Sequence, residues 1–347
     1  MSFGSTRTRT HPSAPWALAL VFVAMLAAAP SALIARAQDA SPEADLGALE
    51  GEIEIDGSST VSPITEAAAE EFGAAGAEGV DISVGVSGTG GGFERFCNGE
   101  TDIQDASRGI EEDEIALCAE NGVDYYELEL GSDGITVVVN EENTDLTCIS
   151  TAQLAQVWAE DGEVSTFADL NPEFADEEIA LYGPGPDSGT FDFFNEEILG
   201  EDVAATTDYT PSEDDNVLVE GVGGDQNALG YFGYSFYAEN EETLNAVALA
   251  TTEDLSDCVE PSPETIRDGS YPLSRPLFIY VKAESLQDEA IQEFVRYYAA
   301  NAETLVQSVN YVPLPTEDYA ALTARVEGAI SGDTEPDSAA AEGTPEA

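Results

Sequence analysis

Residues 52–330 alternate between two kinds of hydrophobic pattern. Short segments such as "EIEIDG" (52–57) and "VDISVGVSG" (80–88) have the length and apolar content of strands. The segments "SPITEAAAEEFGAAG" (62–76) and "LQDEAIQEFVRYYAANAETLVQSV" (286–309) instead carry apolar residues at helical spacing. Because strands and helices alternate along the chain, the sequence predicts an α/β fold with mostly parallel sheets.

The middle of the chain continues this alternation. "VDYYELEL" (123–130) and "GITVVVN" (134–140) are predicted as two strands, and "EEIALYG" (177–183) and "RPLFIYVK" (275–282) as two more. Helices are predicted around "GGFERFCNG", "EEDEIALCAENG", "TAQLAQVWAE" and "SGTFDFFNEEILG". No repeat of solenoid length is present.

The first 37 residues have the features of a signal peptide. Arg7 and Arg9 form a basic start, "PWALALVFVAMLAAAP" (15–30) is apolar, and "ARA" ending at Ala37 fits a small-x-small cleavage site. The alternative is a membrane anchor, but the apolar run is short beside the ~20 residues of a spanning helix. We therefore expect an exported protein, periplasmic or extracellular and associated with the cell surface.

The two ends of the mature chain differ in composition from its centre. Residues 38–51 are polar and rich in small side chains, which predicts a flexible linker. Residues 331–347 are predicted to form a disordered acidic tail. The stretch between them is long enough for two lobes with separate hydrophobic cores.

The chain is strongly acidic, with 70 Asp and Glu against 10 Lys and Arg and a formal net charge of −60. Nucleic acid and anionic membranes are not expected partners, because both attract basic patches. The acidity by itself is typical of a solvated surface suited to high salt or acidic surroundings. Any anionic ligand would have to be held against a repulsive background.

Four cysteines follow the signal peptide. In an exported chain an even number predicts two disulfides, and four cysteines allow three connectivities. We expect Cys97–Cys118, which are close in sequence, and therefore Cys148–Cys258. A zinc site would need cysteines clustered at short spacing, and these four cysteines are too far apart in the sequence for that.

Histidine is absent from the mature chain, since the single histidine, His11, lies in the predicted signal peptide. Ser-His-Asp and Cys-His nucleophiles are therefore excluded, as is a zinc hydrolase with histidine ligands. A hydrolase that uses two carboxylates stays open, because acidic residues are abundant.

One arrangement occurs three times in the sequence. A strand ends, a cluster of glycine, serine and threonine follows, and a helix begins: "IDGSSTVSPITEAAAEEF", "VGVSGTGGGFERF" and "YGPGPDSGTFDFF". Free N–H groups and the helix dipole favour an anion at such a turn, and hydroxyls add donors. Each turn alone is also compatible with an ordinary helix cap. A fourth segment, "ASRGI", places Arg108 directly after a strand, where the alternative is a surface ion pair.

Several of these motifs occur in an order that resembles a known family. "DGSSTVSPITEAAAEEF", "SGTGGGFERFCNGETDIQDASRGI", "GSDGITVVVN", "DSGTFDFF", "ALGYFGYSF" and "YPLSRPLFIYV" are similar to motifs of PstS-type phosphate-binding proteins of bacterial ABC phosphate transporters. The resemblance runs from about Glu52 to about Val326. Each motif alone is weak evidence for this family, whereas their combination in this order is specific to it.

The resemblance implies a type II periplasmic-binding-protein fold with a phosphate between two α/β lobes. Residues 52–134 and 271–330 would form the first lobe, and residues 135–270 the second. It implies that phosphate is bound by residues of both lobes and by no cofactor. The matching residues are Ser59 and Thr60, then Thr89 and Gly90 with Ser87 as a close substitute, and then Ser188, Gly189 and Thr190.

The sequence departs from the best-known members of this family. They have an acidic residue where Arg108 stands, and an arginine where this chain has Pro184. The chain therefore resembles a Ser-Arg subgroup of the family. A carboxylate that accepts the phosphate proton would reject sulfate, which has no proton to donate. Asp133 is our candidate for this acceptor, and Asp187 is the second.

We therefore expect a non-enzymatic receptor, monomeric, that binds inorganic phosphate and delivers it to an ABC permease. The alternatives are a receptor for another tetrahedral oxyanion such as sulfate or molybdate, a carboxylate-pair hydrolase, and an adhesion or sensory protein that has lost the ligand.

Overall fold

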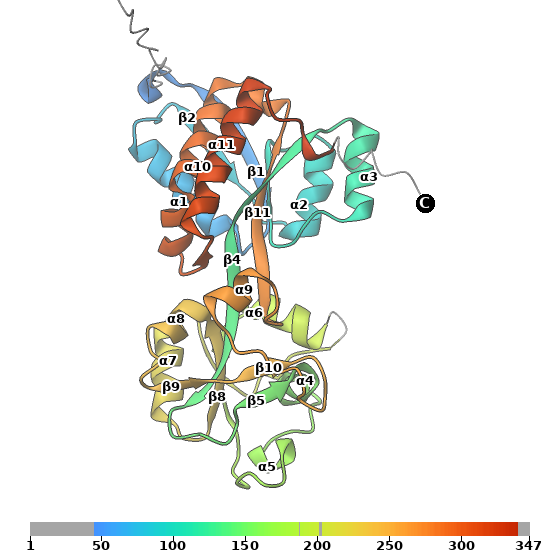
Figure 1. Cartoon of the computed structure of the whole chain (residues 1–347), viewed down its shortest axis with the longest axis vertical. Coiled ribbons are helices and arrows are strands. Elements are labelled where there is room, and N and C mark those ends of the chain that lie inside the picture. Colours follow the sequence, from blue (N-terminus) through green and yellow to red (C-terminus); the bar gives the residue numbers. More distant parts are fainter. Residues whose placement is uncertain (1–44, 187, 201–202, 339–347) are drawn as a thin grey trace, which may run out of the picture. The chain divides into compact units, whose positions relative to one another are not determined.

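The computed structural model of the chain describes residues 45–186, 188–200 and 203–338 (Figure 1). The predicted signal peptide, the first half of the predicted linker (38–44), Asp187 and the last part of the predicted tail (339–347) lie outside the described residues. Within the predicted linker, the structure places a 3-10 turn, η1 (Leu46–Ala48), and the start of the first strand.

We call the part of the molecule that begins at this strand the first lobe. Its parallel strands lie in the order β2-β1-β3, with α1, α10 and α11 on one side and α2 and α3 on the other (Figure 1). These elements are β1 (Gly51–Gly57), α1 (Ser62–Ala74), β2 (Val80–Val84), α2 (Gly88–Cys97), β3 (Ile103–Ala106), α3 (Glu112–Asn121), η3 (Ser285–Gln287), α10 (Glu289–Ser308) and α11 (Thr316–Ser331).

The second lobe contains the parallel strands β8-β6-β7 and a separate pair, β5 and β10. A π-helical turn, η2, directly continues α6. The elements are β5 (Cys148–Ser150), α4 (Thr151–Trp158), α5 (Phe167–Leu170), β6 (Ala180–Pro184), α6 (Gly189–Phe194), η2 (Asn195–Leu199), β7 (Thr210–Ser212), α7 (Asp215–Gly224), β8 (Ala228–Gly233), α8 (Tyr234–Ala238), β9 (Leu244–Ala246), β10 (Ala248–Ala250) and α9 (Pro263–Arg267).

Two long strands connect the lobes. β4 (Tyr125–Asn140) pairs antiparallel with β11 (Ser274–Lys282) through Gly134, and with β8 from Ile135 onward. β9 and the short β12 (Val312–Pro313) also pair antiparallel with β4. The sheet is therefore parallel at its outer strands and antiparallel where the lobes join.

The prediction of two strands at 123–130 and 134–140 was wrong, because β4 is one continuous strand of 16 residues. Its two glycines allow close packing instead of a turn. A Cβ at Gly131 would lie 2.9 Å from the Val312 carbonyl oxygen and from Val306, and one at Gly134 would lie 2.5 Å from Ile266.

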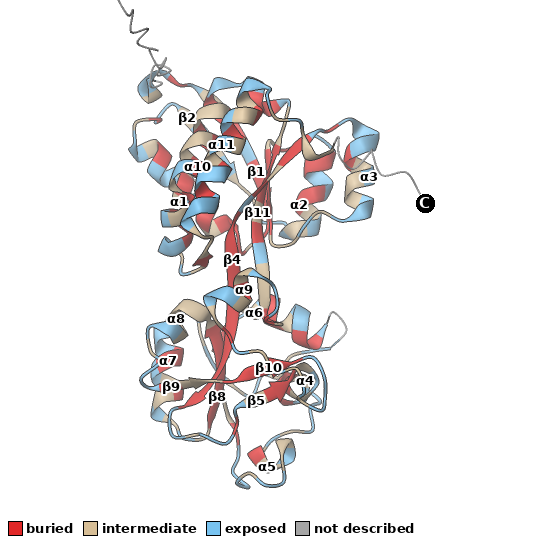
Figure 2. Ribbon diagram, in the orientation of Figure 1, coloured by how far each residue is buried: buried red, intermediate tan, exposed pale blue. Residues whose placement is uncertain are grey.

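Each lobe has its own core, shown by the buried segments in Figure 2. The core of the second lobe holds α6 in place: the Phe194 ring stacks on Tyr231 at 3.7 Å, and Trp158 contacts both rings edge-on. The turn before α6 is therefore attached to a rigid support.

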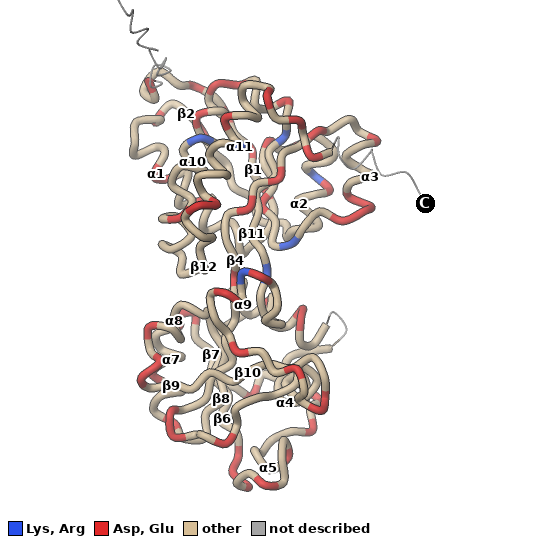
Figure 3. The backbone as a smooth tube through the Cα atoms, viewed as in Figure 1, with Lys and Arg blue, Asp and Glu red and all other residues tan. Residues whose placement is uncertain are grey.

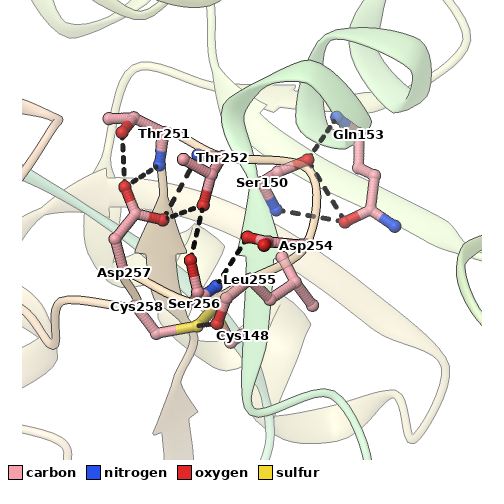
Figure 4. The surroundings of a disulfide bond; sticks show 10 residues. All are labelled: Cys148, Ser150, Gln153, Thr251, Thr252, Asp254, Leu255, Ser256, Asp257 and Cys258. Carbon is pink, nitrogen blue, oxygen red and sulfur yellow. Dashed lines mark hydrogen bonds between the residues drawn. A yellow bond between two sulfur atoms is a disulfide. The ribbon is translucent and has the colours of Figure 1, made fainter.

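The two expected disulfides are confirmed. Cys97–Cys118 joins α2 to α3, and Cys148–Cys258 joins β5 to the segment before α9. Figure 4 shows the second bond beside a loop in which Thr251 and Thr252 donate hydrogen bonds to Asp257.

The described part of the C-terminal segment contacts the first lobe. Arg325 pairs with Asp337, whose carboxylate also accepts the Glu127 N–H at 2.8 Å. Ser338 donates to Asp124. Among the described residues, the structure has no helix that combines the length and apolar character needed to span a bilayer.

Candidate functional site

A cavity of about 510 Å³ lies where the two lobes and β11 meet. The first lobe lines it with the turns that follow β1, β2 and β3, and the second lobe lines it with α6 and η2. The lining residues are Ser58, Ser59, Gly88, Thr89, Gly90, Ser107, Arg108, Asp192, Phe193, Glu196, Glu197, Ser274, Arg275 and Pro276.

The turn between β1 and α1 brings hydroxyl groups to the cavity. The Ser58 N–H donates to the Asp105 carbonyl at 2.9 Å, and the Ser62 N–H donates to the Ser58 carbonyl at 3.0 Å. α1 then begins without a side-chain cap. Of the predicted site residues, Ser59 lines the cavity and Thr60 is buried beside it.

Buried Asp56 holds the turn before α2. The Ser87 N–H and hydroxyl donate to Asp56 Oδ1 at 2.9 and 2.8 Å, and Arg95 pairs with Asp56 Oδ2. Ser87 makes no side-chain cap for α2, so the N–H groups of the first helical turn stay available for a ligand. Thr89 and Gly90 belong to the cavity lining, whereas Ser87 faces Asp56 instead.

Arg108 lies in the cavity wall, paired with acidic residues around the start of α3. Its Nη1 and Nη2 donate to the two Glu114 carboxylate oxygens at 2.9 and 2.8 Å, and its Nε is 3.2 Å from Glu111. The hydrogen bonds to Glu114 raise the pKa of Arg108 further. Thr89 Oγ1 lies 3.1 Å from Ser107 Oγ, so the turns before α2 and after β3 are linked.

Arg275 occupies the centre of the site and contacts both lobes. Its Nε and Nη2 donate to Asp133 Oδ2 at 3.2 and 3.1 Å, and Nη2 also reaches Thr60 Oγ1. From the second lobe, the Gly189 carbonyl accepts from Nη2 at 3.3 Å, and the guanidinium lies 3.8 Å above the Phe193 ring. Nη1 makes no hydrogen bond among the described residues, which leaves its donors for a ligand in the cavity.

The predicted turn of the second lobe lies against the first lobe. Ser188 caps α6, its hydroxyl accepting the Thr190 N–H at 3.2 Å. A Cβ at Gly189 would lie 3.5 Å from both Ser59 Oγ and Thr60 Oγ1. Residues predicted from separate motifs 129 positions or more apart in the chain are therefore neighbours in space.

Acidic side chains of α6 and η2 form the opposite wall of the cavity. Burial raises the pKa of Asp192 and of Glu197, and the Arg275 charge opposes the shift in both. Burial also raises the pKa of Asp133, again opposed by Arg275. Figure 3 shows how few Lys and Arg positions stand among the Asp and Glu of the chain, so both arginines of this cavity are notable.

Sequence reasoning missed Arg275, although it lies within the motif "YPLSRPLFIYV" used for the family resemblance. The signal was available: the motif contains one of the few basic residues, next to a proline at the start of a strand. The sequence analysis also missed Ser58 and the three acidic residues of the opposite wall, Asp192, Glu196 and Glu197. Among the described residues, no group of three His, Cys, Asp or Glu side chains could hold a metal ion.

Three comparisons relate this chain to known proteins. Residues 38–302 match the model of the PBP (periplasmic binding protein) superfamily domain. Protein SphX from Synechocystis sp. is 47% identical over 77% of this chain and 80% of its own length. The phosphate-binding protein PstS from Staphylococcus saprophyticus is 37% identical over 85% of this chain and 90% of its own length.

The structural comparison agrees with these sequence matches. The crystal structure of a possible phosphate binding protein from Planctomyces limnophilus superposes with a TM-score of 0.77 at 42% identity, covering 81% of this chain and 99% of that one. The two-lobed mixed α/β architecture is that of the type II periplasmic binding proteins. The chain therefore belongs to the PBP superfamily and, within it, to the family of PstS-type proteins.

Proposed function

We propose that the protein binds inorganic phosphate in the cavity between its lobes. The observation that supports this most strongly is the position of Arg275, which lines the cavity together with serine and threonine residues and whose Nη1 has no hydrogen-bond partner among the described residues. A guanidinium is well suited to phosphate because its N–H groups form a rigid fork. The name of one relative, the phosphate-binding protein PstS, points to the same ligand.

The donors that would surround the ion come from both lobes. The first lobe offers the hydroxyls of Ser59, Thr60 and Thr89 and the first N–H groups of α2. The second lobe offers the Ser188–Thr190 turn, which already lies against the first. Charge-assisted hydrogen bonds inside a cleft are screened far less than surface charges, so these local donors can outweigh the net negative charge.

A buried carboxylate is proposed to select protonated phosphate over sulfate. Asp133 stays our proposed acceptor of the phosphate proton, because it is buried and pairs with Arg275, whose charge favours the carboxylate against the rise in pKa that burial causes. Asp187 stays the second candidate, and Asp192 is a further one, because it lines the cavity itself. Sulfate competition distinguishes them: only the Asn variant of the true acceptor should bind sulfate nearly as well as phosphate.

The proposed role is delivery of phosphate to the permease of an ABC transporter, without catalysis. In this proposal the protein is exported, works as a monomer outside the membrane, and needs no cofactor. The first lobe (52–134 and 271–330) and the second (135–270) would close over the ion, with β4 and β11 as the hinge.

Calorimetric titration tests this function. The mature chain, from Gln38, is unfolded and refolded to remove bound phosphate and then titrated with phosphate, arsenate and sulfate. We expect one phosphate per chain, arsenate competing and sulfate competing weakly. The absence of any phosphate binding would overturn the proposal, and stronger binding of sulfate would replace it with a receptor for a different oxyanion.

A further inference from the structure

The buried carboxyl group of Asp105 lies next to the turn between β1 and α1 and has no role in the phosphate binding proposed above. Asp105, on β3, is 0% exposed, as are Thr65 on α1 and Tyr298 on α10. Thr65 Oγ1 donates to Asp105 Oδ1 at 2.9 Å and lies 2.9 Å from the Tyr298 hydroxyl. Asp105 Oδ2 has no hydrogen-bond partner among the described residues.

Asp105 forms no ion pair within the part of the chain that the structure describes. Neighbouring strands place Gly57 and Ile279 opposite it in the sheet. The titratable groups that act on it are the buried Tyr298 from α10 and the exposed Glu66 from α1, whose charge opposes ionisation of Asp105. Burial accordingly raises the pKa of Asp105 to about 8, with the Thr65 hydrogen bond acting in the opposite direction. A buried carboxylate without a counter-ion is costly, so the neutral acid is the favoured form near pH 7.

Asp105 is joined in two ways to the turn between β1 and α1. Its carbonyl accepts the N–H of Ser58, the first residue of that turn. Its side chain holds Thr65, which lies in the first part of α1, the helix that the turn begins. A change in the charge of this one carboxyl therefore acts on both the position and the electrostatics of the turn that carries Ser59 and Thr60.

We propose that Asp105 is a positioning residue whose protonated form holds the turn between β1 and α1 in its binding arrangement, and whose ionisation weakens anion binding. This inference rests on the phosphate binding proposed above. Loss of the proton places a negative charge below the bound anion and leaves a buried carboxylate with one hydrogen bond. Linkage requires the reciprocal effect: bound phosphate favours the protonated acid, so phosphate binding takes up protons near pH 8.

The direct test is calorimetric titration of the wild-type chain and of Asp105→Asn with phosphate, near pH 8, in two buffers with different ionisation enthalpies. The difference between buffers gives the protons taken up on binding. Phosphate's own protonation contributes equally to both chains, so the excess in the wild type belongs to Asp105. We expect greater proton uptake by the wild type. We also expect its affinity to fall about fivefold or more relative to Asp105→Asn between one pH unit below and one above the pKa of Asp105.

Asp102→Asn is the matched control. Asp102 lies just before the same strand, pairs with Lys282 and is 22% exposed at its side chain. Its substitution should leave the proton uptake equal to that of the wild type. If Asp105→Asn does not fold, the carboxyl titration of Asp105 in the unmodified chain, followed by carbon NMR with and without phosphate, gives the same answer.

The outcomes separate the two proposals. Phosphate binding with equal proton uptake in the wild type and Asp105→Asn overturns this inference alone, as does an Asp105 carboxyl that titrates below pH 5. Absence of phosphate binding at every pH overturns the proposed function and this inference with it. The inference is supported if NMR gives Asp105 a pKa near 8 and this pKa rises when phosphate binds.

Discussion

Arg275 and Asp133 are directly opposite each other on the antiparallel strands β11 and β4, and the guanidinium donates twice to the Asp133 carboxylate, at 3.2 and 3.1 Å. Both side chains are almost fully buried, 11% and 3% exposed. The register of these two strands therefore fixes the position of Arg275, which contacts two of the three predicted turns, at Thr60 and at Gly189. A shift of one residue would move Arg275 to the opposite face of the sheet.

Replacement of Arg275 should remove the main positive charge of the site. We expect Arg275→Gln to bind phosphate about 10- to 100-fold more weakly, because hydrogen bonds to charged groups contribute about 1.5–3 kcal/mol. The measurement is calorimetric titration with phosphate. Because Arg275→Gln alone leaves Asp133 buried without its partner, the variant is also made together with Asp133→Asn.

Arg296→Ala is the control for this prediction, since Arg296 pairs with Glu293 and Glu327 on the surface of the first lobe. It should bind phosphate as the wild type does. Wild-type affinity in the folded Arg275→Gln/Asp133→Asn variant would show that Arg275 has no part in binding.

Glu114 is expected to restrain Arg108. Both Glu114 oxygens accept from the Arg108 guanidinium at the cavity wall, so Glu114→Gln should release this charge toward an anion. We expect phosphate binding to become tighter by up to about fivefold, in keeping with the small energies of part-exposed ion pairs. Glutamine preserves the capping box at the start of α3. Glu112→Gln, with the same change in net charge, is the control, and equal affinities of the two variants would contradict the prediction.

Asp215 provides a pH-dependent test of stability. It is the first residue of α7, and burial raises its pKa to about 6, from the 3.8 of an unperturbed aspartate. Because the folded state binds the proton more tightly than the unfolded state, wild-type stability falls relative to Asp215→Asn as pH rises from 4 to 6. Denaturant unfolding at several pH values should show the two chains converging below pH 4 and the variant more stable above pH 6. If the difference in free energy of unfolding between the two chains stays constant across this pH range, the pKa of Asp215 is not raised by folding.

The two disulfides should contribute unequally to the free energy of unfolding. Cys97–Cys118 spans 21 positions and Cys148–Cys258 spans 110. In the chain-entropy model the longer loop gives about 4–5 kcal/mol and the shorter about 3 kcal/mol. Paired Cys→Ser variants, compared by their denaturant midpoints, should lose more stability at Cys148–Cys258, and the reverse order would contradict the model for this protein.

Stability should rise with salt because of the net charge of −60. Repulsion among surface carboxylates opposes the compact state, and added KCl screens it. Thermal melts at increasing KCl concentration measure the effect directly. A melting temperature that falls as KCl is added would contradict this expectation.

The sequence predicted those parts of the molecule that depend on local patterns. The turns at Ser59 and Thr89 follow strands and precede helices, as the glycine and hydroxyl clusters indicated, and both face one cavity. The disulfide pairs were also predictable, because few pairings were available.

Features that depend on tertiary packing were not predictable in the same way. Gly131 and Gly134 looked like a break in β4, but they make room for side chains from distant helices. The Ser87 hydroxyl is taken by Asp56, a partner 31 positions away. The contact of Arg275 with Asp133 requires a strand register between positions 142 apart, which periodicity in one sequence does not supply.

A crystal structure of the mature chain with phosphate is the most direct test of phosphate binding between the lobes. We expect one phosphate ion bonded to the Arg275 guanidinium and to donors from both lobes, at the Ser59–Thr60 turn and at the Ser188–Thr190 turn. An ion bound elsewhere, or held by one lobe without Arg275, would show that this cavity is not the binding site.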